Sequence, residues 1–201
     1  MEILHSNRIN FFIQTLLAVA ILLLYFIVIV IALTPPIARD ALIHHLAIPK
    51  LWLVNGGFYD IKWADFSYYP MNIDLLYLIP LYFKNDILPN FIHMGFGIGT
   101  AWLIYRYLNN KFNRVAGLLG VLVFISTPIV LRMSTVAYVD LGLAFFTTVS
   151  VLAFIHWRKG AYKEFKWLLL SSIAIGLALG TKYNALIAWV FLSFAVVFLY
   201  S

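Results

Sequence analysis

The longest mainly apolar segment of the chain extends from Ile9 to Leu33 and contains no charged residue. It has about the length that a helix needs to cross a bilayer, roughly 20 residues. It exceeds the apolar core of a signal peptide and lacks a small-residue cleavage site, so we expect a retained membrane helix. Composition agrees, because 64% of the residues are hydrophobic and 11% are charged, whereas a soluble domain is about 25% charged.

Six segments are apolar and long enough for membrane helices: 10–33, 88–106, 115–132, 138–157, 166–182 and 184–201. The piece 71–83 is short for a span and contains Asp74 and Pro80. The sequence therefore predicts an all-α polytopic membrane protein with about six transmembrane helices plus one or two interfacial helices. We expect residues 1–201 to form a single transmembrane module. The last segment is apolar up to Ser201, so we also expect that the chain is truncated there or ends at the membrane surface.

Charge predicts the orientation of these helices. If 71–83 does not cross, one side of the membrane holds eight basic and two acidic residues, and the other holds six of each, including every aspartate. The positive-inside rule then places the N-terminus in the cytoplasm and the loop 34–88 outside the cell (inner) membrane. The net charge of +6 is explained by this pattern, and we expect no nucleic-acid partner.

The loop 34–88 contains five of the six aspartates. Pro35 and Pro36 should end the first helix, because proline lacks an amide donor. An amphipathic pattern predicts an interfacial helix over 40–55, and glycine at 56 and 57 suits its C-terminal end. A second interfacial helix is expected over 71–83.

Three charged residues stand near the ends of predicted helices on the outer side: Asp40, Asp140 and Lys182. Each also has a structural interpretation. The two aspartates suit N-caps, and lysine suits a helix C-terminus, where it interacts with the macrodipole and can snorkel. Together they suit transfer from a membrane-bound phosphate ester, because a carboxylate can deprotonate an acceptor and a cation can stabilise a leaving phosphate.

The histidines give a weaker signal. His44 and His45 are adjacent, so in an α-helix they point about 100° apart and do not easily bind one metal. His93 and His156 lie within or at the end of predicted spans with no evident partner. The chain has no cysteine, and a divalent metal cofactor stays open.

The order of four motifs is similar to that of the bacterial and archaeal C-type glycosyltransferases related to protein O-mannosyltransferases and the lipid A aminoarabinose transferase. These motifs are RDALIHHLAIPKLWLVNGG, YYPMNIDLLYL, STVAYVDLGLAFF and GLALGTKYNAL. The resemblance covers nearly the whole chain, which corresponds to the N-terminal transmembrane module. It implies a polytopic inverting transferase that passes a sugar from a polyprenyl-phosphate donor to a lipid, glycan or protein acceptor on the outer face.

The resemblance also implies roles for individual residues. Asp40 matches the acid of the first external loop and Asp140 that of the second, both as candidate catalytic residues. Lys182 matches a lysine after a glycine-rich helix end, a candidate for binding the donor phosphate. Relatives often carry tyrosine where this chain has His44. The other candidate substrate-binding residues are Arg39, His44, His45, Lys50, Tyr138 and Tyr183.

Two other hypotheses compete with the transferase. A non-catalytic membrane scaffold or subunit would keep the same fold and bind a partner. A lipid or small-solute transporter would need polar groups near the midplane of the membrane, and the predicted spans carry few charges there. The transferase hypothesis expects Asp40 and Asp140 to face one cavity, with Lys182 at its rim.

Overall fold

The structure is a computed structural model that describes the backbone of residues 2–200 and the side chains of residues 9–199. Every regular element in this range is helical, with no strand. The long elements are α1 (Glu2–Ala32), α4 (Leu88–Lys111), α5 (Arg114–Ser126), α7 (Asp140–Lys159), α8 (Phe165–Leu179) and α9 (Ala185–Tyr200). The short ones are the π-helix η1 (Ala41–His45), α2 (Ala47–Asn55), the 3-10 helix η2 (Asp65–Tyr68), α3 (Asn72–Tyr82) and α6 (Pro128–Met133).

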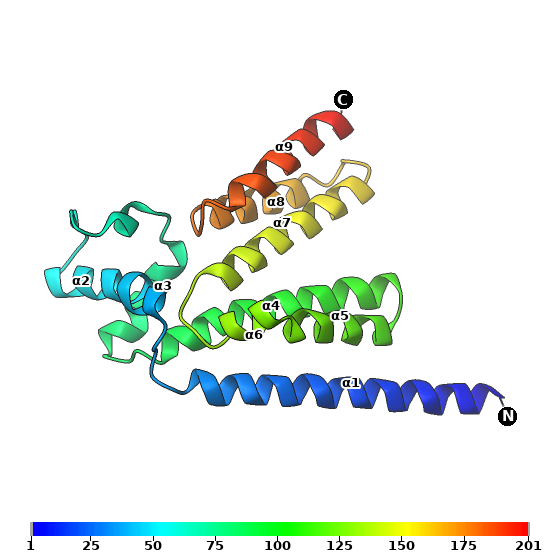
Figure 1. Ribbon diagram of the computed structural model, residues 1–201. Helices are drawn as coiled ribbons and strands as arrows, with labels where there is room; N and C mark the ends of the chain where they lie inside the picture. The colour runs from blue at the N-terminus through cyan, green and yellow to red at the C-terminus, as the bar shows by residue number, and fades with distance from the viewer. Residues whose placement is uncertain (1, 201) are drawn as a thin grey trace.

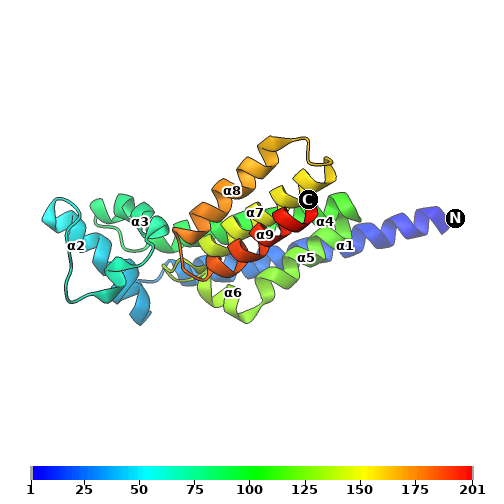
Figure 2. The same ribbon diagram turned by 90° about the horizontal axis from the view of Figure 1, so that it is seen from above.

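The long helices run back and forth between two ends of a bundle (Figure 1). One end, here called the loop end, carries segment 34–88 with α2 and α3 and the connections 134–139 and 180–184. The other, the N-terminal end, carries the start of α1 and the connections after α4 and α7. Figure 2 shows the same separation from above. Segment 34–88 therefore lies entirely at one end of the bundle.

Fewer helices than the six predicted spans are long and apolar enough to cross a membrane. Among the described residues, Ile9–Ala32 and Asp140–Lys159 are long and apolar enough to cross, whereas α5, α8 and α9 are shorter. The predicted span 115–132 is wrong as one helix, because the chain breaks at Thr127 and restarts as α6. Proline at 128 has no amide hydrogen to continue α5.

Helix α1 leaves many large apolar side chains exposed, including Phe11, Leu22 and Phe26. Its other face packs on α5, where Ile21 and Leu24 contact a cluster formed by α4 and α5. An exposed apolar face of this size is stable in lipid rather than in water. The helix ends at Ala32, before the two prolines, as the sequence predicts.

Segment 34–88 folds onto the bundle through its own apolar core. Leu46, Ile73 and Tyr77 are fully buried against Ala137 and Val139 of the connection before α7. Gly56 ends α2 in the left-handed conformation, at φ 74°, which confirms the predicted end of this helix. The predicted interfacial helix 40–55 is instead two pieces, η1 and α2, which meet at Leu46.

Candidate functional site

A cavity of about 300 Å³ lies at the loop end, beneath segment 34–88. It is enclosed by four parts of the chain: the η1 region, the segment around η2 and the start of α3, Val139 before α7, and the connection between α8 and α9. Its lining residues are Asp40, His44, His45, Phe66, Tyr69, Pro70, Met71, Asp74, Val139, Thr181, Lys182, Tyr183 and Asn184.

Asp40 stands at the start of η1 and lines this cavity. Its side chain makes no capping hydrogen bond, and its backbone is already helical. It accepts a long hydrogen bond of 3.4 Å from the Tyr138 hydroxyl. The interpretation of Asp40 as an N-cap is therefore wrong, and its carboxylate is exposed and available to a ligand.

The π-helix η1 brings two neighbouring histidines to the cavity. The Leu46 amide donates to the Ala41 carbonyl, five residues back, at 2.9 Å. A π-turn holds one more residue than an α-turn, and such turns occur frequently at functional sites. Both His44 and His45 line the cavity, and burial lowers the pKa of His44.

His45 is held by Asp74, a residue that sequence reasoning did not select. Its Nδ1 lies 2.7 Å from Asp74 Oδ1, and the Asp74 side chain is 1% exposed. Burial raises the pKa of Asp74, while the hydrogen bond with His45 opposes this shift. A neutral His45 ring that donates from Nδ1 keeps Nε2 as a proton acceptor. Only the placement of an acid inside a short apolar helix hinted at this role.

Lys182 and Asp140 form an ion pair of 2.7 Å beside the cavity. Lys182 lies beyond the end of α8 and lines the cavity. Asp140 is the first residue of α7 rather than its N-cap, and the capping position Val139 makes no side-chain cap bond. Asp140 lines a neighbouring hollow. Of the two candidate carboxylates, Asp40 alone lines the cavity. Asp140 does not line it but pairs with Lys182, which does.

That neighbouring hollow has a volume of about 770 Å³ and lies between α4, α7 and α9, with Phe124 of α5 at one side. Asp140 and Asn184 stand at its loop end, and most of its other lining residues are apolar. Asn184 also lines the 300 Å³ cavity. The Lys182–Asp140 pair therefore stands where a mostly apolar hollow meets a polar cavity.

The segment before α7 is fixed by His93, for which the sequence shows no partner. Its Nε2 accepts a hydrogen bond from the Leu141 amide at 2.9 Å. Its Nδ1 must then carry the proton, and it donates to the carbonyls of Met133 and Val136 at 2.9 and 2.8 Å. The Tyr77 hydroxyl donates to the carbonyl of Tyr138. These bonds hold Tyr138 and Asp140 beside the cavity.

The remaining candidates divide between the cavity and its surroundings. Tyr183 lines the cavity and packs against Tyr69, with ring centroids 5.5 Å apart. Lys50 does not line it and instead pairs with Asp86 at 2.7 Å. Arg39 is exposed and does not line it either. Among the described side chains, no three histidine, aspartate or glutamate residues gather in a metal-binding cluster.

Comparison with known proteins gives a family match. No curated protein and no solved structure matches the chain. A family model described as dolichyl-phosphate-mannose-protein mannosyltransferase matches residues 53–201. The matched part begins after Asp40 and His45 and includes Asp74, Asp140 and Lys182. Members of this family are membrane-embedded enzymes that transfer sugars. The match covers about three quarters of the chain. The chain therefore belongs to the dolichyl-phosphate-mannose-protein mannosyltransferase family, in agreement with the resemblance to C-type glycosyltransferases.

Proposed function

We propose that this chain is the membrane module of a glycosyltransferase that moves a sugar from a polyprenyl-phosphate donor to a lipid, glycan or protein acceptor. One observation carries the proposal beyond family membership. An exposed carboxylate, Asp40, and an ammonium, Lys182, line one cavity that adjoins a mostly apolar hollow. A lipid-phosphate sugar needs a polar site and an apolar site that meet in this way.

The donor fits across this junction. Its prenyl chain would lie in the hollow between α4, α7 and α9, where Leu143, Ile187 and Phe191 supply apolar contacts. Its phosphate would lie by Lys182, whose ammonium is held by Asp140. Its sugar would then project into the cavity that Asp40 lines.

The transfer step uses these groups in separate roles. The acceptor hydroxyl oxygen attacks the anomeric carbon, and the bond from that carbon to the phosphate oxygen breaks. Asp40 takes the hydroxyl proton as general base. Lys182 stabilises the negative charge that develops on the leaving polyprenyl phosphate. A single displacement of this kind inverts the configuration of the anomeric carbon.

The His45–Asp74 pair supports the same cavity. A buried carboxylate bonded to one nitrogen of a histidine ring fixes the orientation of that ring. His45 lies beside Tyr138, with ring centroids 5.4 Å apart, and Tyr138 in turn contacts Asp40. We assign to His45 and Asp74 a positioning role for Asp40 and the acceptor.

The proposed topology follows from charge. The loop end carries every aspartate of the chain, and most of the basic residues lie at the N-terminal end. We place the loop end outside the inner membrane and the N-terminus in the cytoplasm. In this proposal α1, α4, α7, α8, α9 and the α5–α6 pair all cross, which makes the chain a multi-pass protein with α2 and α3 at the outer interface.

The test is sugar transfer in proteoliposomes with radiolabelled polyprenyl-phosphate mannose and a set of lipid, glycan and peptide acceptors. Asp40→Asn should lower the rate of transfer by about 10²- to 10⁴-fold, the usual contribution of a general base. Asp60→Asn removes the same charge from the same loop outside the cavity, and should retain the wild-type rate. Equal rates for Asp40→Asn and wild type would exclude Asp40 as the base. Donor binding without any transfer by the wild type would favour the scaffold.

A further inference from the structure

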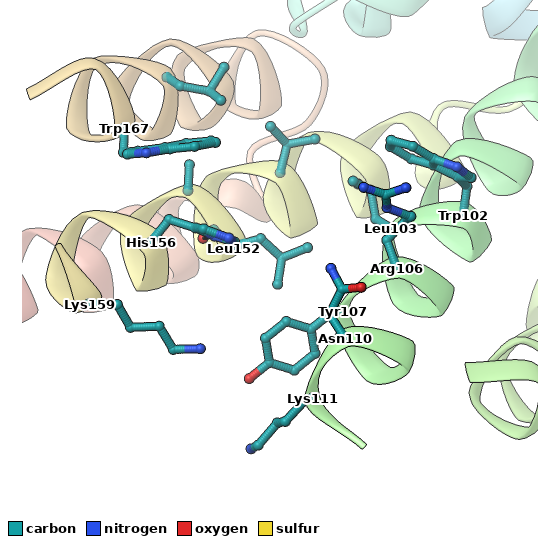
Figure 3. A pocket seen from close by; sticks show the side chains of 13 residues that line it. Trp102, Leu103, Arg106, Tyr107, Asn110, Lys111, Leu152, His156, Lys159 and Trp167 are labelled. Atoms are coloured by element: carbon teal, nitrogen blue, oxygen red, sulfur yellow. Dashed lines mark hydrogen bonds between the residues drawn. The ribbon is translucent and has the colours of Figure 1, made fainter. Parts of the chain in front are cut away.

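A second hollow, of about 400 Å³, lies at the N-terminal end of the bundle between α4, α7 and α8 (Figure 3). It lies at the opposite end of these helices from the candidate site. Basic and aromatic side chains surround its mouth, and Leu103, Leu152 and Leu170 are among the apolar residues that line it.

Three cations from two helices line this hollow: Arg106 and Lys111 of α4 and Lys159 of α7. The ammonium groups of Lys111 and Lys159 lie 5.8 and 5.9 Å from the centre of the same ring, that of Tyr107. Figure 3 shows Lys159 extending from α7 toward this ring. Two ammonium groups beside one ring repel each other unless an anion lies between them.

No carboxylate supplies that anion among the side chains described, residues 9–199, because none of the three cations has an ion-pair partner there. The loop 160–164 between α7 and α8 contains one acid, Glu164, which is already paired. It pairs with Lys166 at 2.8 Å and accepts a hydrogen bond from the Trp167 indole at 3.2 Å. The positive charge of the hollow is therefore left for a ligand.

Aromatic side chains mark the depth of this hollow in the membrane. Trp102 lies one turn from Arg106, whose guanidinium stands 5.7 Å from the indole centre. Trp167 stacks on His156, with ring centroids 4.9 Å apart. Tryptophan and tyrosine favour the headgroup level of a bilayer. In a bilayer whose headgroup level is set by these rings, the cations would lie at the level of the lipid phosphates and the leucines where the acyl chains begin.

We propose that this hollow binds the headgroup of an anionic glycerophospholipid of the surrounding bilayer. Basic hollows between membrane helices recognise such headgroups. The phosphate would lie by Lys111 and Lys159, with Arg106 on the Trp102 side of the hollow. Asn110 and His156 offer hydrogen bonds to the polar headgroup. The exposed apolar faces of Trp102 and Leu170 at the rim suit the first part of the acyl chains. The site does not depend on the proposed sugar transfer.

Orientation by basic residues is the simpler explanation of these charges, and the chain offers a matched control for it. Arg158 and Lys163 belong to the same end of the bundle and count equally in the positive-inside rule. Neither lines the hollow. If the cations serve orientation alone, removing either pair should have the same effect on lipid binding.

The experiment measures quenching of tryptophan fluorescence in the purified full chain by brominated phosphatidylglycerol and by brominated phosphatidylcholine, in mixed detergent micelles. Trp102 and Trp167 report on the hollow, and Trp102→Phe with Trp167→Phe identifies their share of the signal. We expect preferential quenching by phosphatidylglycerol. Arg106→Gln with Lys159→Gln should reduce this preference roughly tenfold or more, and Arg158→Gln with Lys163→Gln should preserve it.

Equal quenching by the two lipids in the wild type would overturn the proposal by itself, even if a variant fails to fold. If both double variants lost the preference for phosphatidylglycerol equally, these basic residues would serve only to orient the protein in the membrane. Inorganic phosphate distinguishes a headgroup site from a free-anion site. If inorganic phosphate at millimolar concentration relieves the quenching as fully as unbrominated phosphatidylglycerol does, the lipid site is contradicted. Weak competition by phosphate supports a lipid site.

Discussion

At the loop end, Asp74, Asp86 and Asp140 each lie 2.7 Å from a histidine or lysine. At the N-terminal end, Arg106, Lys111 and Lys159 line one hollow, each beside an aromatic ring, and the described side chains give them no acid. The first arrangement fixes the position of individual atoms. The second creates a positive field that many anions satisfy.

This difference shows that unpaired basic residues and paired charges have different physical meanings. A surplus of basic residues is a signal for orientation, and it requires no specific geometry. Paired charges require geometry, because a buried or partly buried ion is costly without its partner. The loop end therefore suits chemistry on a positioned substrate, and the N-terminal end suits attachment to an abundant lipid.

The largest expected effect separates two ion pairs that look alike within the loop end. Lys182 and Lys50 are 39% and 44% exposed, and each lies 2.7 Å from an aspartate. Lys182→Met should lower the rate of sugar transfer by about 10²- to 10³-fold, the cost of losing one donor to a developing charge. Lys50→Met should change it little, because Lys50 lies outside the cavity. Equal losses measured by radiolabel transfer would show that charge at this end acts generally.

An intermediate effect concerns the attachment of α3 to the bundle. A Cβ atom on Gly180 would lie 2.1 Å from Asn72 Nδ2, which donates to the Leu177 carbonyl at 3.3 Å. Gly180→Ala should lower the free energy of unfolding by about 1–2 kcal/mol, since the amide must move.

The control for this change lies one turn earlier. A Cβ on Gly176 would meet nothing within 4 Å, so Gly176→Ala should leave stability unchanged or raise it by up to about 1 kcal/mol through helix propensity. Thermal unfolding in detergent measures both variants. Identical unfolding of the two would mean that the Asn72 side chain does not help to hold α3 against the end of α8.

The smallest effect is a pH dependence of opposite sign at the two ends. Burial raises the pKa of Asp74 above 3.8, so folding binds a proton. The stabilisation that comes from this proton uptake is fully present below pH 3.8 and is lost as the pH rises through the raised pKa of Asp74. The hydrogen bond from Lys166 lowers the pKa of Glu164, so its contribution is lost as the pH falls.

Melting temperatures recorded from about pH 3 to about pH 7 test these signs. Asp74→Asn should flatten the decline with rising pH, because its amide does not titrate in that range. Glu164→Gln should remove a weaker trend in the other direction, since Glu164 is exposed and its ion pair is screened by solvent. A wild-type decline that persists unchanged in Asp74→Asn would assign the titration to another group.

Local features of the fold could be predicted because single residues decide them. The prolines after Thr34 end α1, and Gly56 ends α2. Apolar runs marked most of the long helices, although the run through Thr127 contains a break that hydrophobicity alone does not reveal. Asp40 and Asp140 were expected to face one cavity with Lys182 at its rim; Asp40 and Lys182 line one cavity, whereas Asp140 lines the neighbouring hollow.

The rest of the site depends on tertiary packing. Asp74 looked like an obstacle to a membrane span, and its partner His45 lies 29 residues earlier. His93 looked unpaired, yet it makes hydrogen bonds with the backbone of Met133, Val136 and Leu141, which lie 40, 43 and 48 residues later. Neither contact has a local pattern, because each joins segments that only the folded bundle brings together.

The π-turn of η1 has a consequence for insertions and deletions. Its extra residue changes the rotational register between Asp40 and His45, and both face one cavity. Losing one residue from this turn would restore an ordinary α-turn, leave the flanking segments at nearly the same relative rotation, and remove one of the positions through which Asp40, His44 and His45 reach the same cavity. Homologous chains that keep this cavity should therefore keep the number of residues between Asp40 and Leu46, even where the residue types vary.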